Sequence, residues 1–215
     1  DGENVIPVVS LVYNFTKPAG DKPAMLNVDE TQTMFHEFGH ALHSMLSKCH
    51  YRSLSGTNVS RDYVEMPSQF MEHFAFEPSI VKMYAKNYKT GAPIPDALIK
   101  KIQSAATYGQ GFMNTELIAA SLLDMDLHTI SKKTTIKLPD FENQRMNAIG
   151  LIPSIISRYR TPYFQHIFSN GYAAGYYSYT WAAVLDNDAF EAFKEHGVFD
   201  KATATAFRTN VLERG

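Results

Sequence analysis

Residues 29–46 read DETQTMFHEFGHALHSML and decide which fold this chain adopts. Apolar side chains recur here at intervals of three and four positions: Met34, Phe35, Phe38, Ala41, Leu42, Met45 and Leu46. That spacing places them along one face of an α-helix. We therefore expect an amphipathic helix from about Asp29, with Asp29 or Thr31 as its N-terminal cap.

The same stretch contains the five-residue pattern HEFGH, which runs from His36 to His40. Residues four apart in a helix lie on the same face, so both imidazoles can reach one tetrahedral Zn²⁺ at about 2.0–2.1 Å. Glu37 follows the first histidine, off the metal but close enough to take a proton from an attacking water molecule. Because so short a pattern also arises by chance in ordinary helices, the prediction depends on a third ligand.

The third ligand is expected to be acidic. A metzincin pattern requires Gly at position 43 and His at position 46, but the chain has His43 and Leu46. Glu65, in the segment DYVEMPSQ, lies on the next predicted helix, which follows a polar loop. We therefore predict one Zn²⁺ per chain, held by His36, His40 and Glu65.

Three further polar residues lie near these ligands in the helical pattern. Glu72 and Gln69 follow Glu65 by about two turns and one turn, where they either orient the ligating histidines or remain plain surface residues. His43 shares the face of His36 and His40. We interpret it as a structural histidine with satisfied hydrogen bonds, since catalytic zinc sites normally use three protein ligands.

The rest of the chain is predicted to be mainly α-helical. Residues 5–15 form an apolar, β-branched and aromatic run that suits an edge strand because of Pro7, and residues 25–28 are expected to return as a second strand. This gives a small antiparallel hairpin near the N-terminus. Further helices are expected over 62–88, interrupted at Pro78, and over 95–107, 112–131, 139–148, 162–169, 180–196 and beyond Asp200, which suits an N-cap.

The charge balance and the cysteine content narrow the partners and the compartment. The 20 basic and 22 acidic residues give a net charge of -2, which argues against nucleic acid and anionic membranes as partners. The single Cys49 fits a reducing compartment and favours the cytoplasm, although an exported periplasmic protein without disulfides is an alternative. The first residues, DGENVIPVVS, lack an initiator Met, so we expect a longer parent chain.

Three segments together carry a resemblance to a known family: FHEFGHALH (35–43), SGTNVSRDYVEMPSQ (55–69) and HIFSNGYAAGYYSYTW (166–181). They resemble the thimet oligopeptidase (M3) family of zinc metallopeptidases. Within it, SGTNVSRDYVE and RYRTPYFQHIF (158–168) are more similar to the bacterial peptidyl-dipeptidase (dipeptidyl carboxypeptidase) branch than to the oligopeptidase A branch.

The resemblance implies a fold and an active site. It implies a mainly α, zincin-like metallopeptidase catalytic core with a deep channel, and makes residues 1–215 one catalytic domain, the C-terminal part of a longer chain. The missing N-terminal half would complete the cleft. The family's zinc ligands fall on His36, His40 and Glu65, and its general base falls on Glu37.

The resemblance also assigns roles in the Gly- and Tyr-rich segment. His166 and Tyr179 match catalytic positions, and Tyr172 and Tyr176 match substrate-binding positions. From the residues alone, phenols beside small residues can donate hydrogen bonds to a developing oxyanion, although clustered aromatic rings more often pack in a core.

These features predict zinc-dependent hydrolysis of short peptides with release of C-terminal dipeptides. Arg158 and Arg160 are candidates to pair with the substrate's terminal carboxylate, or they are surface residues. Two alternatives stay open: an internally cutting oligopeptidase of the same family, and a non-catalytic fragment that binds zinc or peptide.

Overall fold

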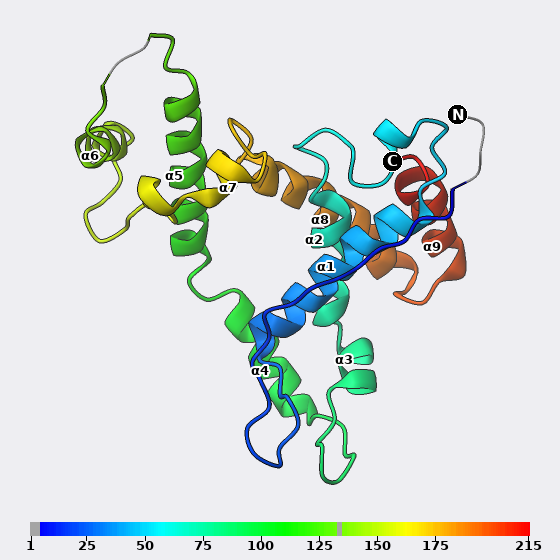
Figure 1. Cartoon of the computed structure of the whole chain (residues 1–215). Coiled ribbons are helices and arrows are strands. Elements are labelled where there is room, and N and C mark those ends of the chain that lie inside the picture. Colours follow the sequence, from blue (N-terminus) through cyan, green and yellow to red (C-terminus); the bar gives the residue numbers. More distant parts are fainter. Residues whose placement is uncertain (1–4, 133–134) are drawn as a thin grey trace. The chain divides into compact units, whose positions relative to one another are not determined.

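The computed structural model describes residues 5–132 and 135–215, which form two compact units (Figure 1). The first unit comprises Asp1–Ala105 together with Ala182–Gly215, and the second comprises Ala106–Trp181. No strand is assigned in the two described ranges, and nearly all regular structure is helical. The mainly helical prediction is therefore confirmed.

The first unit is built around two helices that pack against each other. Its elements are α1 (Val28–Leu46), η1 (Arg52–Leu54), α2 (Met66–Ala75), α3 (Pro78–Tyr84), α4 (Asp96–Ala106), most of α8 (Ser178–His196), α9 (Lys201–Phe207) and the π-helical turn η3 (Arg208–Leu212). Phenylalanine side chains from α2, α8 and α9 form its main core, centred on Phe70, Phe190, Phe193 and Phe207. This core supports α2 from the side of α8.

Gly39 sets the close approach of α1 and α2. A Cβ atom at position 39 would lie 2.5 Å from the carbonyl oxygen of Pro67 and 2.6 Å from the Cα of Ser68. Only glycine leaves room for the backbone of α2 at this distance. Pro67 lies in the first turn of α2, where its missing N–H costs no helical hydrogen bond. The contact brings the residue before α2, Glu65, beside the middle of α1.

The N-terminal hairpin prediction is wrong for the described residues. Residues 5–18 are extended but run along α1 (Figure 1), where the Tyr13 hydroxyl donates to the carbonyl of Met34 and Thr16 donates twice to the carboxylate of Glu30. Residues 25–28 do not return as a strand, because they lead into the start of α1. An apolar β-branched run favours extended backbone, but it does not specify that the partner is a strand.

Asn27, and not Asp29 or Thr31, caps α1. Its side chain accepts from the Glu30 N–H at 2.8 Å, and the Glu30 carboxylate accepts from the Asn27 N–H at 2.9 Å. This reciprocal arrangement is a capping box. The same carboxylate holds Thr16, so the start of α1 and the extended segment are fixed together.

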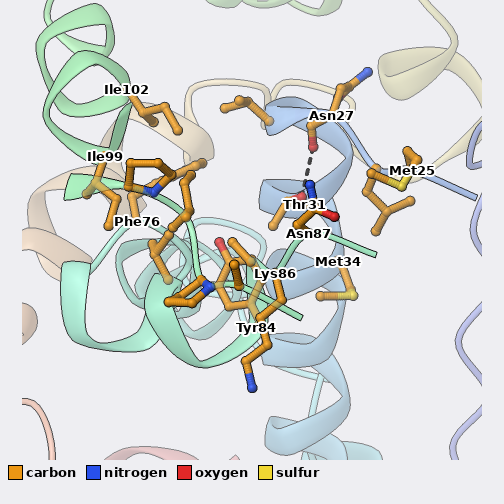
Figure 2. A pocket seen from close by; sticks show the side chains of 18 of the residues that line it. Met25, Asn27, Thr31, Met34, Phe76, Tyr84, Lys86, Asn87, Ile99 and Ile102 are labelled. Carbon is orange, nitrogen blue, oxygen red and sulfur yellow. Dashed lines mark hydrogen bonds between the residues drawn. The ribbon is translucent and has the colours of Figure 1, made fainter. Parts of the chain in front are cut away.

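A pocket of about 640 Å³ lies in the first unit between the start of α1, the 85–95 loop and α4 (Figure 2). Its lining is mostly apolar and includes Met25, Met34, Tyr84 and Ile99. At about 100° per residue, the α1 residues that line it lie on the side of the helix opposite His36 and His40. The pocket is therefore separate from the histidine face.

The second unit contains α5 (Gln110–His128), α6 (Leu138–Ala148), η2 (Thr161–Tyr163), α7 (Gln165–Ser169) and the first residues of α8. Two apolar clusters hold it together. One joins α5 to α6 through Leu123 and Met146. The other joins α5, through Ala120, to Tyr176 in the Gly- and Tyr-rich segment 166–181, called the aromatic loop below. No helix in the described ranges is both long and apolar enough to cross a membrane.

Candidate functional site

The first unit brings His36, His40 and Glu65 together. Nε2 of His36 and Nε2 of His40 each lie 3.3 Å from Oε2 of Glu65. One ligand atom from each residue lies within 4.8 Å of the other two, so the group could hold a metal ion. Glu65 is 2% exposed, while both imidazoles are partly exposed. The cluster thus has a buried carboxylate beneath two accessible histidines.

The spacing of these atoms fits a tetrahedral ion. Bonds of about 2.0–2.1 Å at tetrahedral angles separate neighbouring ligand atoms by about 3.3–3.4 Å. Both nitrogen-to-oxygen separations have this value. Three protein donors leave a fourth position for water or substrate, which is the arrangement of catalytic rather than structural metal sites.

Glu72 orients His36. Its Oε1 lies 2.6 Å from Nδ1 of His36, and its Oε2 accepts from the side-chain amide of Gln32 at 2.5 Å. A carboxylate at Nδ1 favours the tautomer whose Nε2 lone pair is available to a metal. Burial opposes protonation, but the hydrogen bonds and charges of Glu65 and Glu72 raise the pKa of metal-free His36 to about 10. The geometry favours the orienting role for Glu72 over a plain surface role.

Ser68 ties α2 to the cluster, and Gln69 ties α2 to α8. The Ser68 hydroxyl lies 3.0 Å from Oε2 of Glu65 and 2.9 Å from its backbone carbonyl. Gln69 donates to Oδ2 of Asp186 on α8 at 3.2 Å, and Nε2 of His73 lies 2.6 Å from the other oxygen of Asp186. Burial raises the pKa of Asp186, although its bonds to His73 and Gln69 oppose that shift. These contacts fix the helix that follows Glu65.

His43 is fully buried one turn beyond His40. Neither ring nitrogen has a hydrogen-bond partner among the residues that the structure describes, so the prediction of satisfied hydrogen bonds at His43 is wrong. Burial, and then the nearby His40, lower the pKa of His43 to about 4. His43 is therefore neutral near pH 7, and it stays outside the group that could hold a metal.

Glu37 projects from α1 next to His36 and is half-buried, outside the three-residue metal group. Its neighbour is unexpected. Burial, and then the charge of Glu37, raise the pKa of Tyr13. The Tyr13 phenol, which donates to the carbonyl of Met34, therefore lies within electrostatic range of this carboxylate. Nothing in the sequence around Tyr13 indicates that proximity, because the segment looks like an edge strand.

The second unit gathers the four aromatic residues of the loop region. Ring centroids of His166 and Tyr176 lie 5.5 Å apart, those of Tyr176 and Tyr179 5.2 Å, and the stacked rings of Tyr172 and Tyr179 5.5 Å. Tyr176 is 1% exposed, whereas the other three are partly buried. Burial above all raises the pKa of Tyr176 well above its ordinary value. The loop therefore combines one core tyrosine with accessible rings.

The two arginines have different surroundings within this unit. The guanidinium of Arg158 lies 5.7 Å from the ring centroid of Tyr159, and its charge opposes the rise in the pKa of Tyr176 that burial causes. Nε of Arg160 lies 2.7 Å from Oε1 of Glu142, a carboxylate whose side chain is 3% exposed. Arg160 thus pairs with the buried carboxylate of Glu142, whereas Arg158 lies against the ring of Tyr159.

Comparisons with known proteins identify the family of this chain. The model of peptidase family M3 matches residues 1–215. Dipeptidyl carboxypeptidase of Escherichia coli (strain K12) is 42% identical over 97% of this chain, and oligopeptidase A of the same organism is 40% identical over the whole of this chain. A thimet-like oligopeptidase of Dictyostelium discoideum is 33% identical over the whole chain. The chain spans about a third of the length of these relatives, between 31% and 32%. It belongs to peptidase family M3.

Proposed function

We propose that this chain is the zinc-binding catalytic part of a peptidase that releases dipeptides from the C-termini of short peptides. The tetrahedral spacing of His36, His40 and Glu65, in a chain of peptidase family M3, is the observation that carries the proposal. These residues would hold one Zn²⁺. When bound, the ion supplies Lewis acidity that polarises the scissile carbonyl and makes water more acidic.

Glu37 is the proposed general base. Its carboxylate lies beside a ligand without joining the ligand group, so it takes a proton from the attacking water and later delivers it to the leaving amine. Glu72 has a different task, because it holds the proton on Nδ1 of His36. Glu37 on α1 thus acts as the base, and Glu72 on α2 orients the ligand His36.

The aromatic loop is proposed to bind the reacting peptide. Tyr179 donates a hydrogen bond to the oxygen that gains negative charge, and His166 assists it. Tyr172 contacts the substrate from the ring that it stacks on Tyr179. For Tyr176, also proposed as a substrate contact, burial favours a supporting role beneath the other rings. Support for these roles is the assembly of all four rings in one cluster.

Dipeptide release is favoured over internal cleavage by the segments SGTNVSRDYVE and RYRTPYF. The identities to the two relatives from Escherichia coli, 42% and 40%, are too close to decide. The guanidinium of Arg158 can pair with the C-terminal carboxylate of a peptide. We further propose that the remaining two-thirds of a longer parent completes the cleft, and that the enzyme is cytoplasmic.

The test compares peptides that differ only in their terminal charge. An N-blocked tetrapeptide and a nonapeptide, each as acid and as amide, are incubated with the full-length parent enzyme and followed by mass spectrometry. Amidation removes the charge that the cationic partner is proposed to bind, so amides should lose about ten- to hundredfold in kcat/KM. Sequential release of dipeptides from the acids supports the proposal. Equal cleavage of acids and amides at internal bonds assigns an oligopeptidase, and no cleavage of any peptide assigns a non-catalytic binding protein.

A further inference from the structure

Asp124 is a buried carboxylate in α5 whose partners are in the aromatic loop. It is 0% exposed and lies in the helical stretch that supplies Ala120 and Leu123 to the core. A carboxylate in such surroundings is costly unless hydrogen bonds compensate for the lost water. The carboxylate of Asp124 accepts two hydrogen bonds from the loop, from the N–H of Ala174 at 2.9 Å and from the N–H of Tyr176 at 2.9 Å. Nδ1 of His128 lies 2.8 Å from Oδ1 of the same carboxylate.

The two backbone donors flank the tightest part of the loop. Ala174 has φ +52°, a left-handed conformation that a side chain with a Cβ rarely adopts. The N–H of Gly175 bonds back to the carbonyl of Tyr172 at 2.8 Å, and the N–H of Ser178 bonds to the carbonyl of Gly175 at 3.1 Å. Local preference disfavours this backbone path at Ala174. The bonds from both sides of Gly175 to one carboxylate compensate for the strain.

Fixing Tyr176 also fixes its neighbours. The ring of Tyr176 packs edge-on against Tyr179 and His166, and Tyr179 stacks on Tyr172. Because Asp124 binds the N–H of Tyr176 itself, a shift of the carboxylate moves the ring on which the accessible aromatic side chains rest. The other oxygen of Asp124 prevents the loop from rotating about that single bond.

We propose that Asp124 is a positioning residue for the peptidase reaction: its carboxylate locks the 172–176 backbone and thereby places the hydroxyl of Tyr179 for the transition state. The inference rests on the proposed function of the tyrosines. Asp124 itself is too deeply buried to contact a peptide. Its loss should therefore lower kcat more than it raises KM, because misplaced transition-state donors affect turnover rather than ground-state binding.

Asp124→Asn and Asp126→Asn form a matched pair for the test. Both positions lie on α5, but Asp126 pairs with Arg145 of α6. The Asp124→Asn change keeps the shape of the side chain, yet the new amide nitrogen presents a donor to one of the two backbone N–H donors. Each variant is made in the full-length parent enzyme. Zinc content, thermal unfolding, kcat, KM and amide hydrogen exchange over residues 171–181 are measured.

The expected result is a fall in kcat of at least tenfold for Asp124→Asn, a KM within about threefold of wild type, unchanged zinc and at least tenfold faster exchange in the loop. Asp126→Asn should stay within about twofold of wild type in kcat and in loop exchange. If Asp124→Asn does not fold, Asp124→Asn with Ala174→Gly replaces it, because glycine removes the strain at position 174.

Two results overturn the inference. One is an unchanged kcat measured well below the unfolding temperature, which leaves Asp124 a purely structural residue. The other is unchanged loop exchange. Failure of the proposed function looks different, because the wild-type enzyme would then cleave no peptide while the exchange comparison still decides whether Asp124 holds the loop.

Discussion

Glu37 and His36 are neighbours in the chain, but α1 directs them to different partners. His36 contacts Glu65 and Glu72, whereas Glu37 lies outside the metal group. Glu37→Gln removes the base and keeps the shape of the side chain. In the full-length enzyme we expect one bound zinc as in wild type, and a kcat lower by about 10²- to 10⁴-fold. His36→Ala is the control, since it should lose zinc. Near-normal turnover by the Gln variant would remove Glu37 from the mechanism.

His43 makes stability depend on pH. Its pKa is about 4 in the folded protein and about 6.5 in an unfolded chain, so the unfolded state binds more protons between these values. Stability should therefore be complete above pH 6.5 and decrease as the pH falls towards 4. One proton corresponds to about 1.4 kcal/mol per pH unit, or about 2 kcal/mol between pH 6.5 and 5.

The measurement compares wild type with His43→Leu after treatment with a chelator, so that the histidine ligands titrate equally in both. Thermal unfolding at pH 5 and pH 7 should show a smaller pH effect for the variant, because leucine cannot be protonated. Equal pH effects in the two proteins would mean that His43 is protonated normally in the folded state.

Single residues differ in how far the sequence predicts their surroundings. His36 and His40 follow from helical spacing, and Glu65 follows from the need for an acidic third ligand. Asp124 has no motif around it, and its partners are N–H groups of a loop 50 residues away or more. Tyr13 donates to the carbonyl of Met34 from an extended segment that carries no helical pattern. Contacts of this kind depend on tertiary packing, which a local pattern does not encode.

At the scale of elements, periodicity predicts helices better than it predicts their neighbours. The interruption at Pro78 and the cap at Asp200 are confirmed, because each depends on local backbone chemistry. Helix α2 begins at Met66 rather than Asp62, since residues 61–65 form turns that place Glu65 before the helix. The hairpin prediction failed for a different reason: an extended segment can pair with a helix as well as with a strand.

The contact between α1 and α2 yields a prediction about Gly39. An added Cβ meets backbone atoms of Pro67 and Ser68, so one of the two helices has to move. Gly39→Ala should destabilise the protein by about 1–3 kcal/mol, in the range of other overpacked contacts. Because the shift separates Glu65 from the histidines, zinc affinity should also fall at least tenfold.

Gly111→Ala is the matched control, since a Cβ there meets nothing within 4 Å and the position lies in the first turn of α5. This change should leave zinc affinity unaltered and raise stability slightly. Competition with a fluorescent chelator measures the affinity in the full-length enzyme. Equal zinc affinities for the two alanine variants would contradict the idea that the helix contact sets the ligand geometry.

At the scale of the whole molecule, one unit contains the three residues that could hold a metal ion, and the other contains the aromatic loop. Its relatives are about three times as long. Large apolar side chains are widely exposed, among them Val8 at 95%, Tyr108 at 88% and Val12 at 86%. Exposed apolar surface on this scale favours contact with further protein. We therefore expect residues 1–215 to be sufficient for zinc binding, and catalysis to require the full-length parent.

The prediction compares residues 1–215 alone with the full-length parent. All three proposed ligands lie within the first unit, so the chain alone should bind about one zinc, released by chelators. Its kcat/KM on short peptides should be at least a hundredfold below that of the parent, because under the proposed function the rest of the parent completes the cleft and helps to hold a peptide in place. Elemental analysis and a quenched fluorescent peptide assay measure the two quantities. Glu65→Ala in the chain alone is the control, and it should abolish zinc binding. Activity of the chain alone within tenfold of the parent would mean that residues 1–215 already form the whole catalytic cleft.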